Sequence, residues 1–308
     1  MPEFGPPIAP TISGEEWRFS SSVGLRLHPR AVTPRKSAIS SDCRGTPITI
    51  ESSRGEPGEM EESAFIGGVI AGLVYLAAGI RLIRLSLRTQ GSPELILGIT
   101  FILWALSYVC WQIPIATANQ PLTQPLFFAG RVFTNAGTIF LAYFIWIGFR
   151  NQSRWAKYLV YTIALCMLAA MVGSIAQGDW GGIQPASNPW WFLDWGAGFV
   201  AMAWIGVEGF IEYTKARQRL RLDHCDPLVC NRFLLWGIVG IIWTLYNGVF
   251  LLQTVEFEAS QVWSSNLDRA IAVIEAIGVA LVCLIFFPPR FYRLWIAGAA
   301  PASAPEEA

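Results

Sequence analysis

Ionisable and amide side chains inside apolar stretches are the residues of this sequence that could do chemistry. Residues 127–149, FFAGRVFTNAGTIFLAYFIWIGF, carry Arg131, and Asn135 follows one helical turn later on the same face. Glu275 lies in a second apolar stretch. An ionisable group at the centre of a membrane helix costs about 2.5 kcal/mol or more, so it needs a partner, water or a ligand. Arg131 and Glu275 lie about 8 and 11 Å below the same membrane surface at 1.5 Å per residue, so we predict that they pair or share a hydrogen-bonded network.

Four further polar residues are predicted at a similar depth: Gln112, Asp194, Tyr246 and Asn247. Together with Arg131, Asn135 and Glu275 they predict an outward-facing polar cluster, with the Trp-rich segment 178–195 above it. Two roles stay open for the cluster. It binds a ligand, or it only sets helix packing, as buried ion pairs often do. Arg131 alone can also extend to the interface without a partner.

Glu208 and Glu212 are spaced i, i+4 near the inner end of the fifth apolar stretch. Paired carboxylates can handle protons or hold a cation. Lys215 and Arg219 follow at helical spacing, however, so a neutralised or solvated inner end is the favoured interpretation.

The elements that position these residues are membrane helices. The chain has 308 residues, of which 53% are hydrophobic and only 14% charged, and its mean hydropathy is +0.43. These values are typical of a polytopic membrane protein. Each apolar stretch is near the roughly 20 residues that cross a bilayer, and each must be helical because backbone groups cannot stay unpaired in lipid. We expect an all-α bundle of seven spans, over residues 64–86, 94–116, 126–149, 156–176, 191–213, 232–254 and 268–288.

Lysine and arginine in the loops predict the orientation, because cytoplasmic loops are enriched in them. The first, third and fifth loops and the C-terminal tail are basic, and the loops between them are not. The N-terminus is therefore predicted outside and the C-terminus in the cytoplasm. Tryptophans at the predicted outer ends are interpreted mainly as interfacial anchors, and these are Trp111, Trp180, Trp190, Trp191, Trp195 and Trp263.

The ends of the chain differ from the predicted membrane domain, residues 60–295. Residues 1–59 are rich in Pro, Gly, Ser and Arg and are predicted to be disordered, as is the short tail 296–308. Met60 stands directly before the first apolar stretch, and a natural start there is our favoured hypothesis.

Several seven-helix activities require residues that the predicted spans lack. A retinal Schiff base needs a lysine in the last span, and the three lysines are Lys36, Lys157 and Lys215. The two histidines, His28 and His224, fall outside the spans, which disfavours haem and zinc chemistry. We therefore expect no enzymatic activity, no cofactor and no metal, and a net charge of zero gives no reason to expect nucleic-acid binding.

Three stretches at predicted cytoplasmic helix ends carry a resemblance: DPLVCNRFLLWG (226–237), RTQGSPELILG (88–98) and FFPPRFYRLW (286–295). In these the chain resembles a family of bacterial seven-helix membrane proteins with no established activity, and more loosely the seven-helix sensor modules of bacterial signalling proteins. The resemblance implies the fold and a location in the bacterial inner (plasma) membrane.

The leading hypothesis is a receptor or sensor in the lipid bilayer. It would bind a small or lipid-like ligand from the outer side and signal to a separate cytoplasmic protein through its basic loops. A small transporter or channel is the second hypothesis, and a scaffold subunit without a ligand is the third. A transporter needs a polar route through the bundle, whereas the predicted inner halves of the third and seventh helices are apolar.

Overall fold

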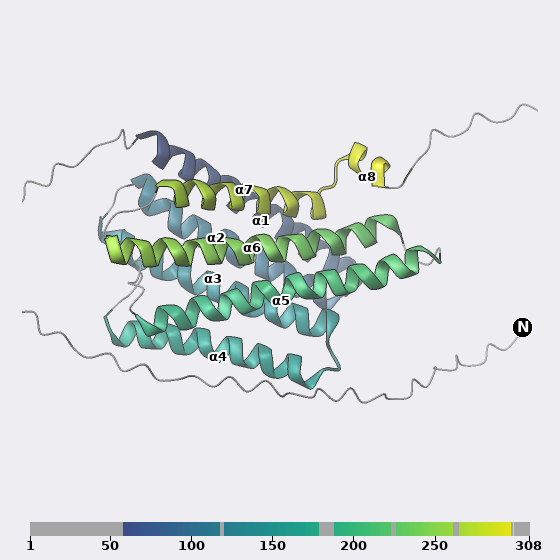
Figure 1. The fold of residues 1–308 in the computed structure, drawn as a ribbon, viewed down its shortest axis with the longest axis horizontal. Helices are drawn as coiled ribbons and strands as arrows, with labels where there is room; N and C mark the ends of the chain where they lie inside the picture. Colours follow the sequence, from purple (N-terminus) through teal and green to yellow (C-terminus); the bar gives the residue numbers. More distant parts are fainter. Residues whose placement is uncertain are drawn as a thin grey trace, which may run out of the picture. The chain divides into compact units, whose positions relative to one another are not determined.

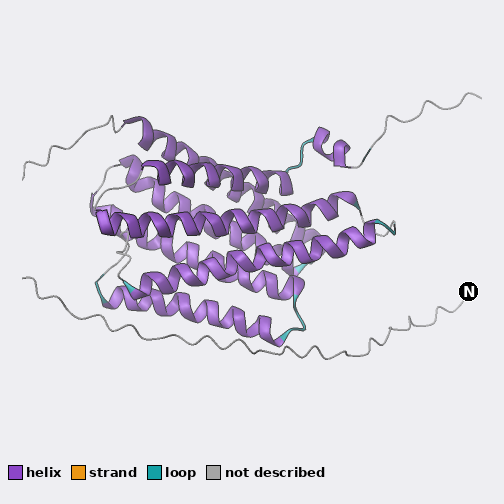
Figure 2. Ribbon diagram, viewed as in Figure 1, coloured by secondary structure: helices purple, strands orange, loops and turns teal. Residues whose placement is uncertain are grey.

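The computed structural model describes residues 58–117, 120–178, 188–222, 226–260, 265–296 and 298. They belong to one of the two units of the chain, Arg54–Ala308. Figure 2 shows helices joined by short connections, and no described residue lies in a strand. The helices are α1 Gly58–Thr89, α2 Ser92–Thr117, α3 Gln120–Phe149, α4 Arg154–Ala176, α5 Pro189–Leu220, α6 Pro227–Ser260, α7 Ser265–Phe286 and α8 Arg290–Ile296. The predicted terminal segments, 1–59 and 296–308, lie almost wholly outside the described residues, and α1 begins just before Met60.

Six of these helices are long and apolar enough to cross a membrane: α1, α2, α3, α4, α6 and α7. The protein is thus a multi-pass membrane protein, and the part of the chain that the structure describes is all helical. Helix α5 has 32 residues, as many as α1. It is not apolar enough to count as a membrane span by composition, because it carries Asp194, Glu208 and Glu212 along its length. The prediction of seven spans is therefore confirmed for six.

Six of the helices form a closed ring. Neighbours in the chain pack against each other from α1 to α3 and from α5 to α7; α3 also contacts α5, and α7 returns to α1. Helix α4 packs outside this ring, against α3 and α5, and Figure 1 shows it at the edge of the bundle. Side chains of the ring helices therefore face a shared interior, and α3 and α5 are direct neighbours in it.

Two helix starts follow from local sequence. Asn188 caps α5, where its side-chain oxygen accepts a hydrogen bond from the backbone N–H of Trp190 at 3.0 Å and Pro189 occupies the first position. Asp226 caps α6 in the same way, through the N–H of Leu228 at 2.8 Å. Proline at the first helical position lacks an N–H that would have no intrahelical partner there, so both starts are well determined.

Glycines bring α5 and α6 into close backbone contact. A Cβ added to Gly209 would collide with the backbone of Gly237, and one added to Gly240 would collide with the backbone of Gly206. A larger residue at these positions would push the helices apart, because neither obstacle is a side chain that can rotate away. This contact lies in the half of the bundle toward the α5–α6 connection.

Basic residues mark one end of the bundle. In Figure 1 the α1–α2, α3–α4, α5–α6 and α7–α8 connections all lie at this end. Every described lysine and arginine except Arg131 and Arg269 belongs to this half, which we call the basic half. The other half, which holds the starts of α1, α3, α5 and α7, is called the cavity half for the reason given below.

Helix α8 was not predicted from the sequence. It follows Pro288 and Pro289 at the basic end and contacts α6, where Asn231 donates a hydrogen bond to the hydroxyl of Tyr292 at 2.7 Å. Phe291 and Trp295 on α8 are exposed.

Candidate ligand-binding site

A cavity of about 420 Å³ occupies the cavity half of the bundle, between α1, α2, α3, α4, α5 and α6. Its volume falls within the range of about 300–1,000 Å³ that is usual for small-molecule sites. Half of its 20 lining residues are aromatic. They are Tyr75, Trp104, Tyr108, Trp111, Phe127, Trp191, Trp195, Trp243, Tyr246 and Phe250.

The aromatic side chains support one another. Trp195 of α5 stacks on Phe250 of α6, with ring centroids 4.6 Å apart and planes 9° apart. Trp243 meets Tyr246 edge to face, with centroids 5.1 Å apart. Such pairs add about 0.5–1.5 kcal/mol beyond the area they bury. The walls are therefore held in place by contacts within the protein, as in a preformed binding site.

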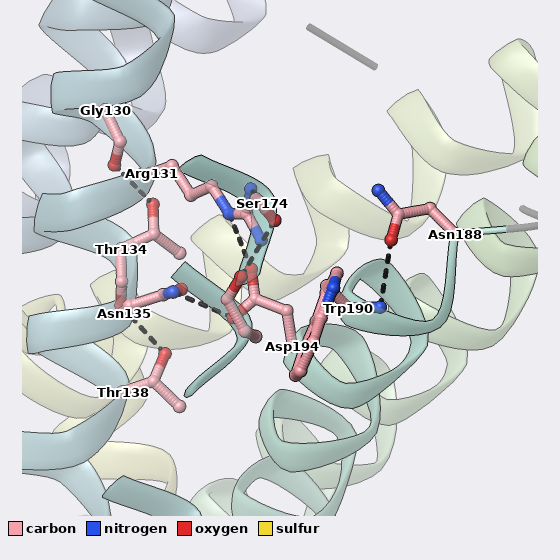
Figure 3. A network of polar contacts seen from close by, with 10 residues as sticks. Gly130, Arg131, Thr134, Asn135, Thr138, Ser174, Asn188, Trp190 and Asp194 are labelled. Atoms are coloured by element: carbon pink, nitrogen blue, oxygen red, sulfur yellow. Dashed lines mark hydrogen bonds and ion pairs between the residues drawn. The ribbon is translucent and has the colours of Figure 1, made fainter. Parts of the chain in front are cut away.

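An ion pair forms the polar part of the wall. The Nε atom of Arg131 donates to Oδ2 of Asp194 at 2.7 Å, and Nη1 donates to the Ser174 hydroxyl at 3.2 Å. Asn135, one turn below Arg131, donates to Oδ1 of Asp194 at 2.8 Å. Figure 3 shows how these side chains converge from α3, α4 and α5. Both carboxylate oxygens of Asp194 thus have partners, as a buried charge requires.

The predicted pairing of Arg131 with Glu275 is wrong. Arg131 pairs with Asp194, and Glu275 accepts a hydrogen bond from the hydroxyl of Tyr108 on α2. Helices α3 and α7 do not contact each other in the described part of the ring, whereas α3 and α5 do. Equal depth in the membrane was therefore not enough, because helix order around the ring decides which side chains meet.

The other residues of the predicted polar cluster divide into two groups. Tyr246 and Asn247 line the cavity with Arg131, Asn135 and Asp194, and Asn247 donates to the Trp243 carbonyl at 2.6 Å. Gln112 does not line it; its side chain lies against Gly68, which has no Cβ in the way. Glu275 lies behind the wall, where it contacts the lining residue Tyr108.

The aromatic lining was missed from the sequence, and part of it was interpreted differently. Trp111, Trp191 and Trp195 were assigned to the interface but line the cavity. One signal was available on α2, where Trp104, Tyr108 and Trp111 recur at helical spacing on one face. The central part of the Trp-rich segment, residues 179–187, lies outside the described residues, as does Trp263.

Glu208 is the second buried carboxylate, and it lies in the basic half. Its side chain is 2% exposed and accepts two hydrogen bonds from Nε of Arg150, at 2.8 and 3.0 Å, and one from Trp204 at 3.1 Å. These hydrogen bonds raise the pKa of the Arg150 guanidinium above its ordinary value. The prediction that basic residues neutralise this end holds for Glu212, which pairs with Lys215 at 2.6 Å. For Glu208 the partner is instead Arg150, the residue that directly follows α3.

No three His, Cys, Asp or Glu side chains gather closely enough to hold a metal ion among the described residues. Both histidines, His28 and His224, lie outside the described residues.

Comparisons with models of protein families, with curated proteins and with solved structures gave no match. The resemblance to bacterial seven-helix proteins therefore stays a prediction.

Proposed function

We propose that this protein is a membrane receptor or sensor that binds a small ligand in the aromatic cavity and signals to a separate cytoplasmic protein through the basic end. The observation that carries the proposal is the cavity itself: it is of ligand size, walled by mutually supporting rings, and carries one charge-balanced polar network. In this proposal the cavity opens toward the outer side, because the basic half faces the cytoplasm.

Helix α5 completes seven spans in the proposed topology. Its two buried carboxylates, Asp194 and Glu208, are paired with Arg131 of α3 and with Arg150 directly after α3, so their burial is compensated. An odd number of spans then places the two termini on opposite sides of the membrane. Because the basic end faces the cytoplasm, the C-terminus is cytoplasmic and the N-terminus lies outside, and the membrane is the bacterial inner membrane.

The packing of the basic half favours a sensor over a transporter. Trp104, Met202 and Trp243 form the floor of the cavity. Beneath them is a second void of only about 10 Å³ with no polar lining residue besides the tryptophans. A space of that size holds at most one water and needs polar partners for it. The described residues therefore offer no polar route from the cavity to the basic end.

Two matched glycine substitutions on α5 test the cavity. Gly198 lines it, whereas a Cβ added to Gly196 meets nothing within 4 Å. Gly198→Leu should fill the cavity and Gly196→Leu should not, and both changes raise helix propensity equally. The probe is N-phenyl-1-naphthylamine, a neutral fluorescent aromatic, added to the protein in detergent micelles. Binding is read as energy transfer from the lining tryptophans.

Saturable energy transfer is expected in the wild type and in Gly196→Leu, with its loss in Gly198→Leu. Equal transfer in all three proteins would overturn the proposed binding site. Signalling is tested by amide hydrogen exchange at residues 215–222 and 227–232 of the basic end. The exchange rates should change when the probe saturates the wild type. Unchanged rates would overturn the signalling role and leave a binding or scaffold role.

A further inference from the structure

The charge balance of the cavity restricts its ligand. Among the described residues that line the cavity, the charged ones are Arg131 and Asp194, and they neutralise each other. Both carboxylate oxygens of Asp194 are already taken by Arg131 and Asn135. A charged ligand would add an uncompensated charge to a site walled mainly by rings, which is costly away from water. This step, like those below, rests on the proposed function of the cavity.

Hydrogen-bond donors on the wall restrict the ligand further. The hydroxyls of Ser107, Thr134 and Thr138 donate to carbonyls of their own helices. The Tyr75 hydroxyl and the Nη2 atom of Arg131 are buried, and neither has a hydrogen-bond partner among the described residues. A buried donor without a partner is unfavourable, and a ligand with an acceptor can satisfy it. Tyr75 itself is 1% exposed and lines the cavity.

The rings restrict the shape of the ligand. Aromatic walls contributed by α1, α2, α3, α5 and α6 offer faces and edges to a flat molecule, the geometry in which ring contacts are favourable. Aromatic cavities also bind organic cations. Here the positively charged guanidinium of Arg131 lines the same wall. Both carboxylate oxygens of its partner Asp194 already accept hydrogen bonds, so no anionic group remains among the described lining residues to hold a cation.

We infer that the cavity binds a neutral, planar, conjugated molecule whose polar group is a hydrogen-bond acceptor such as a carbonyl, and that the Tyr75 hydroxyl donates to this group. Tyr75 is then a specificity-determining residue. It lies on α1, and its ring contacts Phe101 of the packed basic half, with centroids 5.6 Å apart.

Four probes of one size test the ligand class: 2-acetonaphthone as the neutral acceptor, 2-ethylnaphthalene as the apolar form, 2-naphthoate as the anion and 2-naphthylmethylammonium as the cation. Each competes with N-phenyl-1-naphthylamine for the wild type in micelles, and Gly198→Leu gives the background. The variants are Tyr75→Phe, which removes only the hydroxyl, and Tyr143→Phe, which makes the same change on a 38% exposed residue outside the lining.

We expect 2-acetonaphthone to bind most tightly, about fivefold above 2-ethylnaphthalene, since one hydrogen bond contributes roughly 1 kcal/mol. Tyr75→Phe should remove that advantage, and Tyr143→Phe should retain it. Tightest binding of the anion or cation, or equal binding of ketone and hydrocarbon, overturns the inferred class while the binding site stands. No competition by any probe, with no binding of N-phenyl-1-naphthylamine above the Gly198→Leu background, overturns the proposed binding site as well.

Discussion

Two ion pairs connect α5 to α3 and to the residue that follows α3, one in each half of the bundle, and the two differ in what surrounds them. In the basic half, Arg150 pairs with Glu208, whose side chain is 2% exposed and also accepts from Trp204. In the cavity half, Arg131 pairs with Asp194 beside a cavity of about 420 Å³, and its Nη2 atom has no partner among the described residues.

The difference separates a structural pair from a candidate binding pair. The carboxylate of Glu208 is saturated and enclosed, so its pair can hold the helices but has nothing to offer a ligand. The Nη2 atom of Arg131, by contrast, is a hydrogen-bond donor without a partner among the described residues, and it lies on the aromatic wall of the cavity. Buried ion pairs in one protein thus need not share a role, and the unpartnered atoms distinguish them better than burial does.

The largest effect should come from breaking the Arg150–Glu208 pair, whose carboxylate is enclosed although the Arg150 side chain is 30% exposed. Arg150→Gln leaves the Glu208 carboxylate without a counter-charge and should lower the free energy of unfolding by about 4 kcal/mol. The matched Arg131→Gln should cost only about 2 kcal/mol, because Asp194 keeps Asn135 and faces a cavity. Titration with sodium dodecyl sulfate in mixed micelles measures both. The double variant Arg150→Gln/Glu208→Gln should regain most of the loss. A larger cost for Arg131→Gln would reverse the comparison.

Close helix packing should give the next largest effect. Gly240→Ala places a Cβ against the backbone of Gly206 in the basic half, and we expect a loss of about 3 kcal/mol. Gly248→Ala, on the same helix in the cavity half, meets nothing within 4 Å and should be neutral or stabilising by up to about 1 kcal/mol. Thermal unfolding followed by circular dichroism compares the two. Similar melting temperatures would show that the halves are packed alike.

A smaller effect is expected behind the cavity wall. Tyr108→Phe removes the hydrogen bond to Glu275 and should cost about 2 kcal/mol, because a hydrogen bond to a carboxylate is stronger than a neutral one. The same detergent titration applies, with Tyr143→Phe as the control. If Tyr108→Phe behaves like that control, the α2–α7 contact contributes nothing to stability.

The smallest effect should come from Tyr75→Phe. Its hydroxyl is buried without a partner among the described residues, so removing it without ligand present should cause no loss of stability and should raise stability by up to about 1 kcal/mol. Together with the Tyr108 variant this is the most sensitive test of the comparison, since the two substitutions are chemically identical. A loss as large as that of Tyr108→Phe would mean that the Tyr75 hydroxyl is structural.

Part of the candidate site was predictable. Arg131 and Asn135 stand one turn apart in an apolar stretch, so their shared face could be predicted to turn inward, and Asp194 was among the predicted polar cluster. Glu275 was assigned to Arg131 because depth can be counted along a helix, whereas the order of helices around the ring cannot. The roles of Trp191 and Trp195 were obscured for a related reason: tryptophan near a helix end satisfies an interfacial position and a cavity wall equally well.

The sequence by itself predicted helices apolar enough to span a membrane, six of which the structure contains among the seven expected, and it determined which helix ends are basic. Those properties follow from the transfer of each residue between water and lipid, which adds up along the chain. Only the tertiary structure decided that α3 faces α5, that Arg131 meets Asp194, and that ten aromatic residues line one cavity. These depend on how each helix is rotated and how closely backbones approach, as at Gly206 and Gly240, and therefore on contacts between residues far apart in sequence.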